Sequence, residues 1–227
     1  MFTGIVQRLC AISEVVDEHA LRRLTIDLGS LGNGLQVGAS VAINGTCLTV
    51  TQLVDCPTPD DVSLEAPVDV SFDVSFDVIG ESLDHTNLGD LIVGSLVNVE
   101  RSFRVGDEIG GHILSGHISD RVQIASIDTA ENEHNINFAV AAGWMKYLHH
   151  KGFVALDGAS LTIASVDHKA NQIGVCLIPE TIERTTLGSA EVGDWINLEV
   201  DSQTQAVVDT VERMLDSPQW QARVSDA

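Results

Sequence analysis

Residues 41–50, VAINGTCLTV, recur without a gap as residues 154–163, VALDGASLTI. Each copy places a turn dipeptide, Asn44-Gly45 or Asp157-Gly158, between two short runs of apolar and β-branched residues. Asn, Asp and Gly tolerate the positive φ that two-residue hairpin turns require. The repeated stretch therefore predicts the same β-hairpin twice in one chain.

Two further blocks repeat in the same order around this hairpin. Residues 3–6, TGIV, correspond to 115–118, SGHI, and residues 81–100 correspond to 180–199 through a shared TxLG core and a closing N(V/L)E. Three repeated blocks in one order indicate internal duplication. The predicted parts are a first domain, 1–100, a second domain, 101–202, and a C-terminal helix and tail, 203–227.

The first half carries an insertion. The offset between equivalent residues is 113 from Val41 to Val154 but 99 from Glu81 to Glu180, a difference of 14 residues. The extra residues fall within about 56–78, CPTPDDVSLEAPVDVSFDVSFDV, which begins with prolines and then repeats VSFD with the alternation of a strand. We expect an enlarged hairpin there.

The chain as a whole is typical of β structure. Short apolar runs rich in Val, Ile and Leu alternate with turn residues such as Gly38, Gly94 and Gly188. Closely spaced strands of this kind favour a small closed barrel in each half. The predicted fold class is all-β, with two tandem barrels.

One helix is predicted outside the repeat, over residues 204–215. Val207, Val211, Met214 and Leu215 recur at helical spacing, Asp201 and Ser202 are N-cap candidates, and Pro218 follows the end. Two interpretations stay open for this apolar stripe: it packs on its own barrel, or it joins identical helices of other subunits.

Composition excludes several classes of function. The chain has 12 Lys+Arg against 33 Asp+Glu and a formal charge of −21, which would repel a phosphate backbone, so no nucleic-acid partner is expected. No segment approaches the length of a membrane span and no signal peptide is recognisable, so we expect a cytoplasmic protein. Its 4 cysteines form no CxxC pair, and no metal site or disulfide framework is predicted.

Several motifs together resemble those of the riboflavin synthase family. They are MFTGIV at the N-terminus, NGxCLTV in the first half, DEIGGHxxSGHI at the join, KGFxxxDGxSLT in the second half and IPETxERTTLG after it. The resemblance runs in order from Met1 to about Arg213, interrupted only by the insertion. Each string alone is weak, but the set is specific.

The resemblance implies a fold, a reaction and partners. The fold would be two six-stranded Greek-key barrels, each holding one lumazine, in a homotrimer tied by the C-terminal helices. Two molecules of 6,7-dimethyl-8-ribityllumazine would give riboflavin and 5-amino-6-ribitylamino-uracil by four-carbon transfer, without cofactor or metal. The active site would form between the first barrel of one subunit and the second barrel of its neighbour, and lumazine synthase is a further expected partner.

Six residues are candidates for catalysis. Cys47 and Ser160 occupy equivalent repeat positions, so the two pockets carry a thiol and a hydroxyl at the same place. This difference could make one bound lumazine the acceptor and the other the donor. A thiol or hydroxyl could add at position 7 or direct water to it, and a histidine could accept the methyl proton. By resemblance, Asp201 acts together with Ser40 and His117. His117 is preferred to His112, because it occupies the repeat position equivalent to Ile5, which we expect in the first strand that forms the pocket. The candidates are Ser40, Cys47, His112, His117, Ser160 and Asp201.

A second group is expected to hold the substrate. Thr49 and Thr162 lie two residues beyond Cys47 and Ser160, on the same strand face, where a hydroxyl could bond the pyrimidine edge. Glu and hydroxyl residues of the third repeated block suit the ribityl chain. The substrate-binding candidates are Gly4, Ile5, Val6, Leu48, Thr49, Glu81, Ser82, Gly116, Ile118, Lys151, Leu161, Thr162, Ile178, Pro179, Glu180 and Thr181.

Two departures from the family and one alternative remain. Thr46 stands where the family often has a second cysteine, which should be harmless because Cys47 is retained. Gly80 replaces a usual Lys before Glu81 and, with the neighbouring insertion, puts the affinity of the first pocket in doubt. The alternative is a non-catalytic antenna protein that binds lumazine or flavin on the same duplicated barrel. A reductase-type flavin domain has no support, because no GxGxxG opens a helix after a strand.

Overall fold

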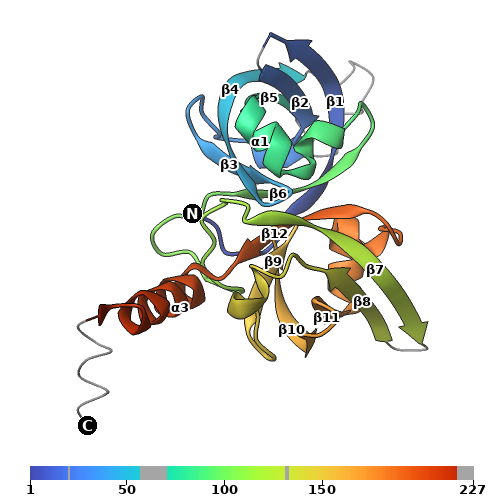
Figure 1. The fold of residues 1–227 in the computed structure, drawn as a ribbon. Coiled ribbons are helices and arrows are strands. Elements are labelled where there is room, and N and C mark those ends of the chain that lie inside the picture. Colours follow the sequence, from blue (N-terminus) through green and yellow to red (C-terminus); the bar gives the residue numbers. More distant parts are fainter. Residues whose placement is uncertain (20, 57–70, 131–132, 219–227) are drawn as a thin grey trace.

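The structure, a computed structural model, describes residues 1–19, 21–56, 71–130 and 133–218. Its first half is a closed barrel of six antiparallel strands in the order β1-β2-β5-β4-β3-β6 (Figure 1). The strands are β1 (Arg8–Glu18), β2 (Leu21–Asp27), β3 (Ser40–Ile43), β4 (Thr46–Cys56), β5 (Ser71–Ile79) and β6 (Leu96–Arg101). Short helices η1 (Gly29–Gly32), α1 (Gly80–His85) and η2 (Asn87–Asp90) connect them.

The second half repeats the first. Its barrel has the order β10-β11-β8-β7-β12-β9, which is the first order again when each strand is replaced by its repeat equivalent. The strands are β7 (Asp120–Ala130), β8 (Glu133–Ala139), β9 (Phe153–Leu156), β10 (Ala159–Asp167), β11 (Gln172–Leu177) and β12 (Trp195–Val200). Helices η3 (Met145–Tyr147), α2 (Pro179–Arg184) and η4 (Thr186–Gly188) complete it. The predicted all-β fold with two tandem barrels is confirmed.

Both predicted hairpin turns form. Asn44 and Gly45 have φ of 45° and 79°, and Asp157 and Gly158 have 44° and 79°, the paired positive values of a tight hairpin turn. The two turns also meet: a Cβ on Gly45 would lie 2.7 Å from the main-chain nitrogen of Gly158. Glycine is therefore required at this point both for the turn and for the contact between barrels.

Strands β6 and β12 are buried on both faces, because one face lines a barrel core and the other meets the opposite barrel. In β6, Val97 and Val99 pack in the core of the first barrel, while Asn98 and Glu100 are buried outside it. Asn98 donates to the carbonyl of Asp157 at 2.8 Å. Its repeat equivalent Asn197 donates to the carbonyl of Asn44, also at 2.8 Å. The barrels are thus joined by reciprocal polar contacts about a pseudo-twofold axis.

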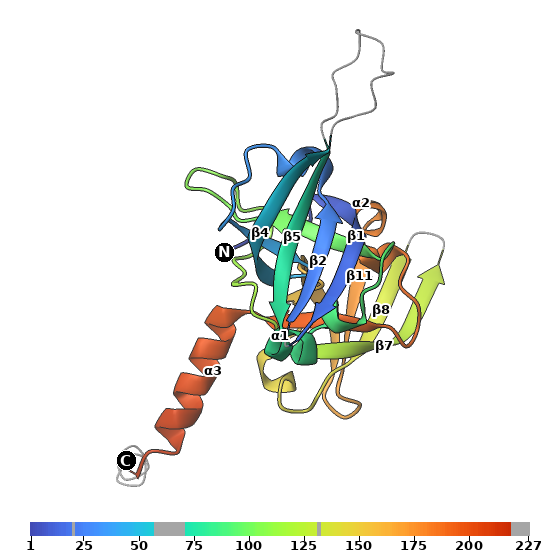
Figure 2. The same cartoon turned by 90° about the horizontal axis from the view of Figure 1, so that it is seen from above.

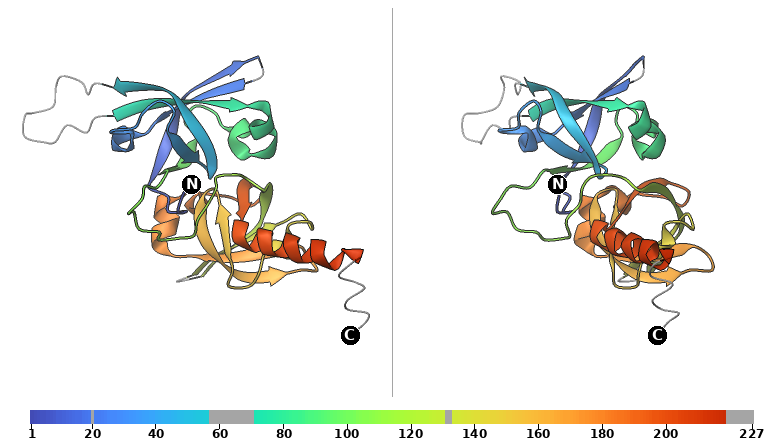
Figure 3. Two further views of the ribbon diagram at one scale, coloured as in Figure 1. Left: turned by 90° about the vertical axis from the view of Figure 1, so that its left-hand side faces the viewer. Right: turned by 60° about the vertical axis from the view of Figure 1, so that its left-hand side comes forward.

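The N-terminal segment lies between the barrels (Figures 1 and 3). Phe2 forms an isolated antiparallel bridge with Leu114, and both are buried with Ala42 and Ala155 in a small cluster of their own. Residues 3–7 have no regular strand, since β1 begins at Arg8. The expectation that Ile5 lies in a first strand is therefore wrong.

The described part of the insertion is strand. β4 extends to Cys56 and pairs with β5, in which the alternating VSFD repeat buries Val74 and Phe76. Residues 57–70 of the predicted enlarged hairpin lie outside the described residues.

The predicted C-terminal helix is α3 (Ser202–Leu215), which starts two residues earlier than expected because Asp201 caps it. It projects away from the barrels (Figure 2). Val208 packs against the second barrel, and the Tyr147 hydroxyl donates to Asp209 at 2.5 Å. Val207, Val211 and Met214 are exposed. The interpretation that this stripe packs on its own barrel is wrong. No helix in the described ranges is long and apolar enough to cross a membrane.

Candidate functional site

Each barrel carries one equivalent polar face, on the outside of its repeated hairpin. In the first barrel, Ser40 of β3 lies opposite Thr49 of β4, and Ala42 lies opposite Cys47. Side chains alternate along a strand, so Ser40, Cys47 and Thr49 share the outer face. Leu48 points the other way, into the barrel core, and only its main chain could meet a ligand.

In the second barrel the same register gives a different set of side chains. Phe153 lies opposite Thr162, and Ala155 lies opposite Ser160. The repeat thus places an aromatic ring where the first barrel has Ser40, and a hydroxyl where it has a thiol. Lys151, with a φ of 65°, precedes this strand and is exposed.

Each face is covered by a segment from the other half of the chain. The Ser160 main-chain N–H donates to the carbonyl of Gly4 at 2.8 Å, and the Cys47 N–H donates to the carbonyl of Gly116 at 2.8 Å. Residues 4–6 therefore cover the second barrel, and residues 116–118 cover the first. Chain order alone would have assigned each segment to its own barrel.

Glycine is obligatory in both covering segments. Gly4 and Gly116 have φ of 74° and 80°. A Cβ on Gly4 would lie 2.5 Å from the Ser160 Cβ, and one on Gly116 would lie 2.6 Å from the Cys47 Cβ. The glycines of the TGIV and SGHI motifs are thus explained by close approach to the residues at the centre of each face.

Two buried carboxylates hold the covering segments. Glu100 accepts from the N–H of Thr3 at 2.6 Å and of Gly4 at 3.0 Å. Glu199 accepts from the N–H of Ser115 at 2.7 Å and of Gly116 at 3.1 Å. Burial raises the pKa of both carboxyls, and these hydrogen bonds oppose the rise.

A cavity of about 270 Å³ opens on the second-barrel face. It gathers many residues predicted for substrate binding, from the covering segment, β10 and α2. Arg184 and Thr185 also line it, and sequence reasoning missed both, although the repeat pairs them with His85 and Thr86. The lining residues that were predicted are Gly4, Ile5, Val6, Ser160, Leu161, Ile178, Glu180 and Thr181.

His112 lies at the edge of this site and is 7% exposed. Its Nδ1 is 2.6 Å from the Ser160 hydroxyl, and its ring stacks on Phe153 with centroids 5.0 Å apart. Its Nε2 is buried and has no hydrogen-bond partner among the described residues. Burial lowers the pKa of His112, and the charge of Asp201 opposes this shift. A neutral imidazole bonded to a hydroxyl can accept a proton through it.

The other candidates are more dispersed. The Asp201 carboxylate accepts from the main chain of Gln203 and Thr204, which confirms it as the cap of α3. Burial would raise the Asp201 pKa, but hydrogen bonds from Thr204 and Gln203 and the nearby His112 lower it overall. The His117 side chain is exposed in the segment that covers the first barrel.

The remaining predicted residues belong to two short helices and to the end of one covering segment. Glu81 and Ser82 belong to α1, Pro179 is the first residue of α2, and Ile118 ends the segment over the first barrel.

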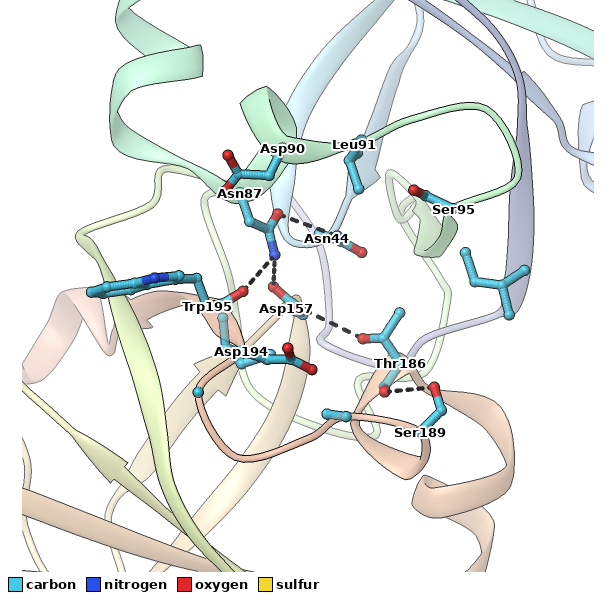
Figure 4. A pocket seen from close by; sticks show the side chains of 14 residues that line it. Asn44, Asn87, Asp90, Leu91, Ser95, Asp157, Thr186, Ser189, Asp194 and Trp195 are labelled. Carbon is cyan, nitrogen blue, oxygen red and sulfur yellow. Dashed lines mark hydrogen bonds between the residues drawn. The ribbon is translucent and has the colours of Figure 1, made fainter.

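A second cavity, about 540 Å³, is a groove between the barrels that the sequence did not predict (Figure 4). Asp157 is buried at its base and accepts from Asn87 Nδ2 and from the N–H of Asn197, each at 2.9 Å. Burial raises the pKa of Asp157 to about 7, against the lowering effect of these bonds. We regard this network as part of the joint between barrels, because it contains none of the predicted site residues.

Comparison with known proteins agrees with this architecture. The family model of the lumazine binding domain matches residues 3–102 and 115–201. Crystal structures of LumP with flavin mononucleotide and with riboflavin superpose with TM-scores of 0.72 and 0.73 at 22% identity, covering 89% of this chain and 100% of theirs. The fold and its two faces thus define a protein made of two lumazine-binding domains.

Closer relatives specify the family. Riboflavin synthase of Escherichia coli (strain K12) is 46% identical over 217 residues, which cover 95% of this chain and 93% of the relative. Riboflavin synthase of Chlamydia pneumoniae is 40% identical over 219 residues, covering 96% and 98%. This chain belongs to the riboflavin synthase family.

Proposed function

We propose that this protein is a riboflavin synthase, which converts two molecules of 6,7-dimethyl-8-ribityllumazine into riboflavin and 5-amino-6-ribitylamino-uracil. The observation that carries the proposal is the pair of equivalent faces, one centred on Cys47 and the other on Ser160. A reaction that uses one substrate in two roles needs two similar sites with different chemistry. The two products together contain all the atoms of the two substrates, so no co-reactant is required.

The second barrel is suited to the donor lumazine. The 7-methyl group of lumazine is acidic because its anion delocalises into the ring. The Ser160 hydroxyl lines the cavity and is bonded to His112, whose pKa is lowered by burial. We assign to this pair the removal of the methyl proton.

The first barrel is suited to the acceptor. Position 7 of lumazine is electrophilic, and Cys47 and Ser40 place a thiol and a hydroxyl on one face of the hairpin. We assign to them addition at position 7 or the direction of water to it. The exposed His117 of the covering segment would stabilise the negative charge that develops during the reaction. The threonines and the residues of α1, α2 and the covering segments would hold the heterocycle and ribityl chain.

Assembly through α3 would bring a donor and an acceptor together. Within one chain, the buried cluster of Phe2, Ala42, Leu114 and Ala155 packs between the two faces and against Cys47. A second subunit is therefore the better source of the opposing face. The exposed Val207, Val211 and Met214 of α3 suit a homotrimer of identical helices. We also propose a cytoplasmic location and lumazine synthase as a partner.

Mixing two inactive variants tests both the reaction and the assembly. Cys47→Ser impairs only the first barrel and His112→Gln only the second, so either homotrimer should convert lumazine fluorescence to that of riboflavin very slowly. If the active site joins two subunits, randomly mixed trimers should regain about a quarter of the wild-type activity, since one site in four pairs two intact barrels. The control is each variant mixed with itself.

The outcomes separate the alternatives. Recovery in the mixed trimers supports an active site between subunits. Wild-type turnover without any recovery would place both roles in one chain and overturn the assembly proposal. Shifted lumazine emission without riboflavin formation by the wild type would instead support the antenna protein.

A further inference from the structure

A separate depression of about 240 Å³ lies on the first barrel, and none of its lining residues belongs to either covering segment. It is lined by the loop of residues 34–36 and by Ala39, Arg101, Ser102 and Arg104. The two arginines are its only charged lining residues, in a chain with 12 Lys+Arg against 33 Asp+Glu. A purely cationic depression is therefore unusual on this molecule.

The two guanidinium groups have no carboxylate partner among the described residues. Arg101 is held in place, since its Nη1 donates to the carbonyls of Leu31 at 2.9 Å and Asn33 at 2.8 Å. Arg104 is exposed, and the nearby Asp107 carboxylate accepts only from its main-chain N–H, at 2.6 Å. By contrast, Arg22, Arg23, Arg121 and Arg184 each pair with a carboxylate.

The two arginines also act on each other. Burial lowers the pKa of Arg101, and the charge of Arg104 lowers it further. Like charges held together without a counter-charge favour the binding of an anion. Guanidinium groups suit phosphate in particular, because their planar fork can donate two parallel hydrogen bonds. Gln36 and Ser102 add neutral polar groups to the same depression.

The barrel itself does not require these residues. The repeat equivalents of Arg101, Ser102 and Arg104 in the second half are Val200, Asp201 and Gln203. The second barrel closes with the same topology although it lacks both arginines. The cationic depression is therefore an addition of the first half, next to Ser40, whose carbonyl accepts from the Ser102 N–H at 3.3 Å.

We propose that this depression is a binding site for a phosphate group, either as inorganic phosphate or as the monoester of a ribityl ligand such as riboflavin 5′-phosphate. Arg104 would supply the free guanidinium fork, and Arg101, fixed by the loop carbonyls, would supply the second charge. The site does not depend on the proposed reaction, because neither arginine belongs to the lumazine-binding faces.

Thermal unfolding of the full-length protein measures this binding without any turnover. Inorganic phosphate at tens of millimolar should raise Tm by roughly 2–5 °C over sodium chloride of equal ionic strength, as a ligand of millimolar Kd does for a protein of this size. Arg104→Gln should abolish the difference. Lys169→Gln, which removes an exposed charge from a turn of the second barrel, should retain it.

Flavin fluorescence titration then distinguishes the two sources. If the monoester is the ligand, riboflavin 5′-phosphate should bind at least about fivefold more tightly than riboflavin, and Arg104→Gln should remove that preference. If only inorganic phosphate binds, the two flavins should be equal while the thermal shift remains. The proposal is overturned if neither phosphate compound differs from its control, or if Arg104→Gln leaves the phosphate effects unchanged.

Discussion

The two faces proposed to bind lumazine share one backbone and differ in a few side chains. Ser40, Cys47 and His117 of the first correspond to Phe153, Ser160 and Ile5 of the second. His112 has no counterpart, and it is the residue that bonds Ser160 and stacks on Phe153. The first face thus offers a half-buried hydroxyl and thiol with an exposed histidine, whereas the second offers a hydroxyl and an imidazole that stacks on an aromatic ring.

This difference indicates how a duplicated fold can acquire a donor site and an acceptor site. The covering glycines, the buried glutamates and the hairpin turns are the same in both halves, because they hold the fold and the close approach of segments. Within the two faces, Ser40, Cys47 and His117 differ from their repeat equivalents at positions that a ligand could contact. Single substitutions at these positions should therefore change the rate of the reaction more than the stability of the fold.

The largest effect is expected at Cys47. Cys47→Ser should lower kcat at least about 100-fold, because an alcohol is a far weaker nucleophile than a thiolate, while the lumazine Kd changes less than about threefold. Stopped-flow turnover and fluorescence titration measure the two quantities. Equal losses in turnover and binding would show that Cys47 only shapes the pocket. Cys176→Ser, at an exposed free cysteine, is the matched control.

His112→Gln should lower kcat by about 10- to 100-fold and also change its pH dependence. The lowered pKa of His112 keeps the imidazole neutral at pH values where a free histidine is protonated, so wild-type activity should fall only below about pH 6.5. Phe153→Ser, which copies the first face, should expose the ring, raise its pKa and move this fall to higher pH. An unchanged pH profile in both variants would exclude His112 as the base.

An effect on stability alone is expected where Asn44 corresponds to Asp157. The pKa of Asp157 is raised by burial to about 7, whereas an unfolded Asp titrates near 3.8. Between these values the folded state keeps a proton that the unfolded state has lost, so the free energy of unfolding falls as pH rises from about 4 to 7.

Asp157→Asn removes this loss and should stabilise the protein by about 2–4 kcal/mol at pH 8, with little gain at pH 4. Urea unfolding at both pH values measures the difference, and Asp84→Asn, on the exposed side of α1, is the control. A stability difference that does not depend on pH would contradict the assigned titration.

Much of the fold could be predicted from the sequence, because its signals are local. The Asn-Gly and Asp-Gly turns, the VSFD alternation and the spacing of Val207 and Val211 each act within a few residues. Because the sequence blocks are duplicated, the prediction of a barrel in the first half also predicted one in the second half. The helix begins two residues earlier than predicted, because Asp201 rather than Ser202 is its cap.

What the sequence did not reveal depends on contacts between distant segments. The stacking of His112 on Phe153, the lining of the cavity by Arg184 and the groove above Asp157 all follow from how the two barrels meet. The preference for His117 over His112 as the base rested on repeat position alone. The structure adds the hydroxyl contact of His112, which repeat position could not show, since His112 has no equivalent in the first half.

Because the covering segments cross over, each half of the chain covers the proposed reaction site of the other half. Trimming the first six residues would remove no strand residue of the first barrel, yet it would remove the segment that covers Ser160, more than a hundred positions away. The true boundaries of each working unit are therefore spatial, and a cut at the sequence midpoint would divide the strands correctly but the sites wrongly.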